Sequence, residues 1–169
     1  MRIIAVAAIL ALGACSDGAE EPANTAVAAA EGLEPGQWEM VLDVAGVEEV
    51  DDSAPMLKLA TGDKVTTSSC VAQGEGKRPP AALLAAVEDA TCTYQNIYMS
   101  RGRLNASLSC RVGELPGDVL FTVEGQYQGN TIEANSTART MFSTAGDSVV
   151  TAKLTGRRTG DCAPAPAGS

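Results

Sequence analysis

Residues 33–162 alternate apolar and polar side chains in a series of short runs, and this alternation constrains the fold more than any other feature. A period of two is the spacing of a β-strand with one buried and one exposed face. In the first run the apolar set is Trp38, Met40, Leu42 and Val44. The runs that we expect to form strands are 37–44, 65–70, 92–99, 104–111, 118–128, 131–142 and 148–157.

Turn-forming pairs lie between several of these runs: Arg101-Gly102, Gly129-Asn130 and Gly146-Asp147. Such pairs connect neighbouring antiparallel strands as hairpins. Pro79-Pro80 precede the alanine-rich and leucine-rich stretch 81–89, and prolines are tolerated where a helix begins. The pattern predicts a mainly β fold with one short α-helix. We expect an antiparallel meander of about seven strands, forming a curved sheet or a small barrel, with the helix over a face or an end.

The amino terminus has the composition of a secretory signal, with Arg2, an apolar run over 3–12 and small residues before position 15. This run is too short to span a bilayer as a helix. The segment 12–15, Leu-Gly-Ala-Cys, resembles the bacterial lipobox. The resemblance implies cleavage between Ala14 and Cys15 and attachment of acyl chains such as palmitate to Cys15, whose thiolate is a strong nucleophile. The alternative is an ordinary cleaved signal with a free cysteine nearby.

The chain therefore divides into four parts. Residues 1–14 form the signal peptide, 15–32 the lipidated cysteine and a flexible acidic tether, 33–162 the β domain, and 163–169 a disordered tail rich in alanine and proline. A lipid on Cys15 places the protein in the bacterial cell envelope, anchored to a membrane and facing the periplasm. Ser16 stands where an aspartate would mark inner-membrane retention in enterobacterial lipoproteins, which favours the outer membrane and leaves the inner membrane open.

Four further cysteines predict two disulfides, as expected for an exported chain. In an unbroken hairpin that pairs Cys92 with Cys110, the alternation sets Tyr94 opposite Leu108 and Tyr98 opposite Leu104, all on one face. A slip by one residue would scatter this apolar set, so the pattern favours a Cys92–Cys110 bridge.

That bridge leaves Cys70 with Cys162. The other pairing, Cys70 with Cys92 and Cys110 with Cys162, stays open. A metal site is not expected, because the chain has no histidine and no C-x-x-C spacing.

Four segments together are similar to the DUF3617 family of small exported bacterial proteins. They are 35–40 (Pro-Gly-Gln-Trp-Glu-Met), 67–70 (Thr-Ser-Ser-Cys), 92–94 (Cys-Thr-Tyr) and 156–162 (Gly-Arg-Arg-Thr-Gly-Asp-Cys). The resemblance spans about 35–162. It implies the β fold and export, and it supplies no activity and no catalytic residue.

The charge balance excludes some classes of partner. The chain has 21 acidic and 12 basic residues, for a net charge of −9, which argues against nucleic-acid binding. The basic clusters Lys77-Arg78, Arg101/Arg103 and Arg157-Arg158 lie beside glycine or proline, and we interpret them as solvated turns. The acidic run over 48–52 lacks the spacing of an EF-hand, so we interpret it as a solvated loop rather than a calcium site.

No arrangement of residues indicates catalysis, so we expect no enzyme, no cofactor and no metal. The chain lacks histidine and has no G-x-S-x-G or S-x-x-K motif. We expect a non-enzymatic interaction or accessory module that binds an envelope protein, by β-augmentation if its edge strands are open. The alternative is a carrier or sensor of a small lipophilic ligand. It requires a cavity lined by some of the aromatic residues, which are Trp38, Tyr94, Tyr98, Phe121, Tyr127 and Phe142.

Overall fold

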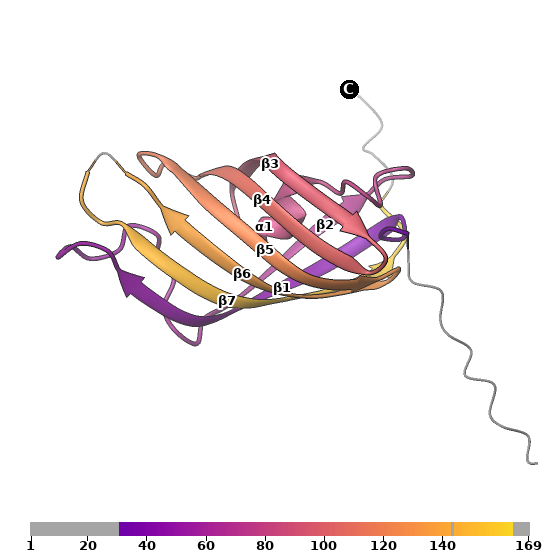
Figure 1. Ribbon diagram of the computed structural model, residues 1–169, viewed down its shortest axis with the longest axis horizontal. Coiled ribbons are helices and arrows are strands. Elements are labelled where there is room, and N and C mark those ends of the chain that lie inside the picture. Colours follow the sequence, from indigo (N-terminus) through magenta and orange to yellow (C-terminus); the bar gives the residue numbers. More distant parts are fainter. Residues whose placement is uncertain (1–30, 143, 164–169) are drawn as a thin grey trace, which may run out of the picture.

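The computed structural model describes residues 31–142 and 144–163, which form one antiparallel sheet and one short helix. The strands are β1 (Gly36–Glu49), β2 (Lys64–Val71), β3 (Ala90–Ser100), β4 (Arg103–Val112), β5 (Asp118–Gln128), β6 (Thr131–Thr140) and β7 (Ser148–Gly160), and the helix is α1 (Ala81–Ala85). Their order in the sheet is β2-β1-β7-β6-β5-β4-β3. The predicted fold class is confirmed, and the sheet curls into a half-barrel that leaves β2 and β3 as open edges (Figure 1).

The inner face of the sheet forms the core, because the apolar residues of each alternating run point to that side. Trp38, Met40 and Leu42 of β1 and Phe121 of β5 are at most 2% exposed. Three consecutive inner positions of β6, after the buried Ile132, carry small side chains instead, which are Ala134, Ser136 and Ala138. Small residues leave room for the larger side chains of the flanking strands, so the sheet curls and still packs densely.

The helix α1 is shorter than the stretch 81–89 that the sequence indicated. It ends at Ala85, because Ala86 adopts a left-handed backbone (φ 51°) and donates its N–H to the carbonyl of Ala82. Leu83 and Leu84 are buried. The helix packs mainly on β3 and also contacts β2, β4 and β5, so it covers the inner side beneath both edge strands (Figure 1).

The β3–β4 hairpin follows the expected register only in its first half. Cys92 pairs with Cys110, but the register shifts by one residue at Gln95, which has no partner on β4. An extra residue of this kind is a β-bulge, and it reverses which side chains face inward in the rest of the strand.

The bulge corrects the position predicted for Tyr98. This tyrosine pairs with Asn105 rather than Leu104, and Met99 takes the position opposite Leu104. Met99 is accordingly buried, with 8% exposed, whereas 56% of Tyr98 is exposed on the outer face. The outer face therefore carries an aromatic side chain that the sequence pattern assigned to the core.

Candidate functional site

The predicted lipidation site lies outside the described residues, as do Ala14 and most of the predicted tether. Lipidation of Cys15 and cleavage after Ala14 therefore stay predictions. Within residues 31–142 and 144–163, no helix is long and apolar enough to cross a membrane.

The two cysteine pairs favoured by the sequence are the pairs that the structure joins. Cys70 and Cys162 lie with their Cα atoms 5.5 Å apart, and Cys92 and Cys110 with theirs 4.1 Å apart. Each bridge fastens one edge strand, because Cys70 belongs to β2 and Cys92 to β3. Disulfides persist in oxidising compartments, so the domain belongs outside the cytoplasm.

The acidic loop over 48–52 has a structural role. The Asp51 carboxylate accepts the backbone N–H groups of Ser53, Gly146 and Asp147 at 2.8–3.1 Å, which joins two loops at one end of the sheet. Hydrogen bonds from Gly146 and Asp147 lower the pKa of Asp51 below its ordinary value, against the opposing effect of burial. Among the described residues, no group of three acidic or cysteine side chains is placed to hold a metal ion.

Lys77 and Arg78 lie in the connection after β2, as expected, but Arg157 and Arg158 lie within β7, so the turn predicted for that cluster is wrong. Arg157 forms an ion pair with Glu39 at 2.7 Å, and Lys77 forms one with Glu31 at 2.9 Å. Arg78 lies over the ring of Tyr94, with 5.1 Å between its guanidinium carbon and the ring centroid. The third cluster, Arg101 and Arg103, lines a surface hollow instead.

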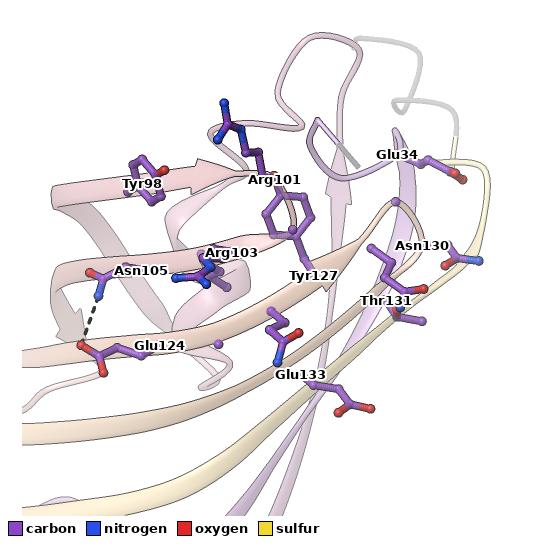
Figure 2. A pocket seen from close by; sticks show the side chains of 16 residues that line it. Glu34, Tyr98, Arg101, Arg103, Asn105, Glu124, Tyr127, Asn130, Thr131 and Glu133 are labelled. Atoms are coloured by element: carbon purple, nitrogen blue, oxygen red, sulfur yellow. Dashed lines mark hydrogen bonds between the residues drawn. The ribbon is translucent and has the colours of Figure 1, made fainter. Parts of the chain in front are cut away.

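This outer-face hollow has a volume of about 1310 Å³ and lies where the β3–β4 and β5–β6 hairpins end (Figure 2). Two rows of paired residues cross its floor, Tyr98–Asn105–Glu124 and Arg103–Gln126–Glu133. Consecutive members of each row come from neighbouring strands, and the odd–even alternation of those strands turns all six outward. The Asn105 side-chain amide donates to the Glu124 carboxylate at 3.1 Å, so one acceptor of the hollow is already engaged.

Arg101 lines the hollow from the β3–β4 turn. Arg101 and Gly102 both have positive φ, at 51° and 76°, as a two-residue type I′ turn requires. Asparagine, aspartate or glycine usually takes the first of these positions, because other side chains are strained there. The turn thus holds a guanidinium at the rim of the hollow at some conformational cost.

The outer-face hollow is polar and carries charges of both signs. It combines an exposed aromatic ring with amide, carboxylate and guanidinium groups, which can donate and accept hydrogen bonds toward one partner. Sequence reasoning placed Tyr98 in the core and Arg103 in a solvated turn, so it missed this site. The sequence does contain a signal for the bulge. The apolar positions of β3 are even-numbered at Cys92 and Tyr94 and odd-numbered at Ile97 and Met99.

A second and smaller hollow, of about 680 Å³, separates the two edges of the sheet; we call it the β2–β3 slot. Residues 66–69 of β2 form one side, and Ala90 and Thr91 of β3 form the other. Ala82 of α1 and the connection over 87–89 complete its lining.

The described residues thus form a β domain with a filled half-barrel, a disulfide at each edge strand and polar surface hollows. The family model described as protein of unknown function (DUF3617) matches residues 33–162, and the chain belongs to this family. No curated protein and no solved structure matches the chain.

Proposed function

We propose that the protein is a non-enzymatic accessory module of the bacterial cell envelope that binds a polar surface of an envelope protein through the outer-face hollow. A lipid on Cys15 holds it to a membrane, with the outer membrane favoured, and the β domain faces the periplasm. The observation that carries the proposal is the contrast between the two faces of the sheet. The inner face is filled by the protein's own side chains, whereas the outer face presents a wide polar hollow with an exposed tyrosine.

The filled inner face supports this function over the alternative of a lipophilic carrier. Such a carrier needs an enclosed apolar cavity. Trp38, Phe121 and Leu154 are almost fully buried in the concave side, and Leu83 and Leu84 of α1 pack there as well. The two hollows described above are open and lined mostly by polar residues.

The residue types around the outer-face hollow fit protein recognition. Tyrosine and arginine are enriched at the centres of protein interfaces, because each combines a large contact surface with directional hydrogen bonds. Tyr98 is already exposed, and Arg101 is held at the rim by a strained turn. Neither side chain contributes to the core of the domain.

The position of the hollow relative to the chain start is also favourable. Glu34 lines the hollow, so the chain enters the domain beside it. Residues 16–30 can reach at most about 54 Å when fully extended, at up to about 3.6 Å per residue. A lipid on Cys15 therefore keeps the hollow within that distance of the membrane.

The test places a photo-crosslinking amino acid at Gln126, inside the hollow, in cells that produce the full chain. We expect light-dependent adducts with one envelope protein, which weaken at least fivefold in an Arg101→Asn variant. Asparagine suits the type I′ turn, so this substitution removes the guanidinium and preserves the hairpin. The matched control places the crosslinker at Thr151, which is exposed on β7 away from the hollow.

Equal adducts at both positions, or adducts unaffected by Arg101→Asn, would contradict the proposal. Mass spectrometry of the same membrane-purified protein tests the remaining parts. The denatured mass should equal the chain from Cys15 with acyl groups and two disulfides. A lipophilic molecule that stays bound in the native spectrum and leaves on denaturation would favour the carrier alternative.

A further inference from the structure

The direction of the edge strands determines how the open sheet can be extended. Every neighbouring pair of strands is antiparallel. Seven strands that alternate in direction leave the first and the last running the same way, so β2 and β3 are parallel to each other. They cannot close the sheet as one more antiparallel pair. A single added strand running the opposite way would be antiparallel to both edges.

The backbone of β2 offers hydrogen-bonding groups to such a strand. Val44 of β1 donates its N–H to the carbonyl of Asp63 at 2.9 Å. This hydrogen bond determines which residues of β2 direct their backbone groups toward β1. In an antiparallel ladder every second residue directs both backbone groups to the same neighbour. Thr67 and Ser69 therefore face β1, and Thr66 and Ser68 direct their N–H and C=O groups to the free side.

The start of β3 offers the same arrangement across the slot. Gly113 donates its N–H to the carbonyl of Asp89 at 3.0 Å, so odd-numbered residues here face β4. Cys92 and Cys110, with 4.1 Å between their Cα atoms, have the close spacing of a pair without backbone hydrogen bonds. Ala90 and Cys92 consequently direct their backbone groups away from β4, toward the free edge.

β2 begins with Lys64, and beyond this residue its edge lacks the proline, charge or bulge that usually protects an edge against strand addition. Proteins guard exposed edges with proline, charged residues or bulges. Residues 65–71 (Val-Thr-Thr-Ser-Ser-Cys-Val) contain no charge and no proline, and their pairing with β1 has no register shift. The part of this edge that lines the slot, 66–69, extends over about 13 Å at 3.3 Å per residue, which is enough for a short strand.

Charge defines the kind of segment that fits. The acidic residues in the lining of the slot are Glu88 and Asp89, and the lining includes no lysine or arginine. An incoming segment that carries a basic residue would be attracted there. The terminal segments of the chain itself do not match this requirement. Residues 16–30 contain three acidic residues and no basic residue, and residues 163–169 contain no basic residue.

We propose that the β2–β3 slot binds an extended segment of a partner protein that bears lysine or arginine and pairs with β2 as an added antiparallel strand. Backbone hydrogen bonds to Thr66 and Ser68 supply affinity, and Glu88 and Asp89 select for basic side chains. This inference does not depend on the outer-face hollow.

The experiment selects binders from a random-peptide display library on the full chain, purified from membranes with both disulfides formed. A parallel selection uses a Ser68→Pro variant, because proline removes an N–H that faces the free edge and not one that faces β1. We expect the selected peptides to be rich in lysine or arginine and poor in proline and acidic residues. The best peptide should lose at least tenfold in affinity for Ser68→Pro and at least threefold for Glu88→Lys.

A Thr122→Lys variant is the matched control, because Thr122 is exposed on the outer face of β5, and it should bind the best peptide with unchanged affinity. Circular dichroism spectra of all variants establish that each one is folded. The proposal would be overturned if the unmodified chain enriched no peptides beyond those selected on Ser68→Pro. It would also be overturned if the selected peptides were not rich in lysine or arginine. A dimer of the unmodified chain that Ser68→Pro dissociates would also overturn it, in favour of a second copy at the β2 edge.

Discussion

The two edges of the half-barrel differ in how they are protected. Along β3, the bulge at Gln95 distorts the free edge, and Tyr94 next to it donates its hydroxyl to the carbonyl of Pro79 at 2.8 Å. Arg78 stacks on the same ring, so the connection from β2 to β3 lies against this edge. The β2 edge over 66–69 has no comparable cover within the described residues, and it borders the slot.

An open sheet can thus protect one edge and leave the other available for pairing. A long flat edge normally risks aggregation. In this protein the unprotected part is short and neutral, and it is fastened close to one end by the Cys70–Cys162 bridge. The following predictions test this contrast between a β3 edge that is covered from Tyr94 onward and a β2 edge that is free.

The largest expected effect comes from removing the disulfide of each edge. A bridge stabilises mainly by constraining the unfolded chain, more so for a longer loop. Cys70 and Cys162 are separated by 92 positions, and Cys92 and Cys110 by 18. We expect replacement of the first pair by alanine to lower the free energy of unfolding by roughly 4.5 kcal/mol, and of the second pair by roughly 3 kcal/mol. Denaturant unfolding measures both, and a larger loss for the hairpin pair would contradict the ranking.

The next effect tests the bulge that distorts the β3 edge. Met99 is buried and Tyr98 is exposed only because the register shifts at Gln95. Met99→Ala should lower the free energy of unfolding by roughly 2–3 kcal/mol, because it leaves a cavity in the core. Tyr98→Ala should change it by less than about 0.5 kcal/mol. Thermal and urea unfolding measure both variants. A larger loss of stability for Tyr98→Ala than for Met99→Ala would contradict the bulge and support a hairpin without a register shift.

The smallest effect comes from the contact that covers β3. Tyr94→Phe removes the hydrogen bond to Pro79 and should lower the free energy of unfolding by about 1 kcal/mol at neutral pH. Unfolding in urea measures this change, with Tyr98→Phe, an exposed position on the same strand, as the control.

The same substitution should alter the pH dependence of stability. Burial raises the pKa of Tyr94 above its ordinary value of 10.0. Once the pH exceeds that value, the unfolded chain loses the phenolic proton while the folded chain retains it, so the free energy of unfolding falls as pH rises. Tyr94→Phe should reduce this fall, and the part that remains is expected from Tyr127, whose pKa burial also raises. An unchanged slope above pH 10 would show that Tyr94 is not buried as described.

Most of the sheet could be predicted from the sequence, because the apolar alternation specifies strands and their inner faces with little ambiguity. The pairing of Cys92 with Cys110 follows from the same pattern. The bulge at Gln95 was not predicted, because the unbroken register also collects apolar side chains, and tyrosine fits either face. The early end of α1 depends on the left-handed conformation of Ala86, which an alanine rarely adopts.

The candidate sites were less predictable than the fold. The outer-face hollow extends across four consecutive strands, and the β2–β3 slot lies between the two ends of the strand order, so no single local motif marks either of them. The outer-face hollow needs four strands in register, and the β2–β3 slot needs the sheet to stay open. An alternating pattern is equally compatible with a closed barrel.

Backbone hydrogen exchange along β2, measured by NMR on the full chain, tests whether the β2 edge is free. The amides of Thr67 and Ser69 are bonded to β1 and should exchange slowly, whereas those of Thr66 and Ser68 should exchange quickly. The selected basic peptide should then slow Thr66 and Ser68 by at least tenfold and leave Thr67 and Ser69 unchanged. Equal protection of all four amides in the free protein would contradict the account, because it would mean that the β2 edge is already paired.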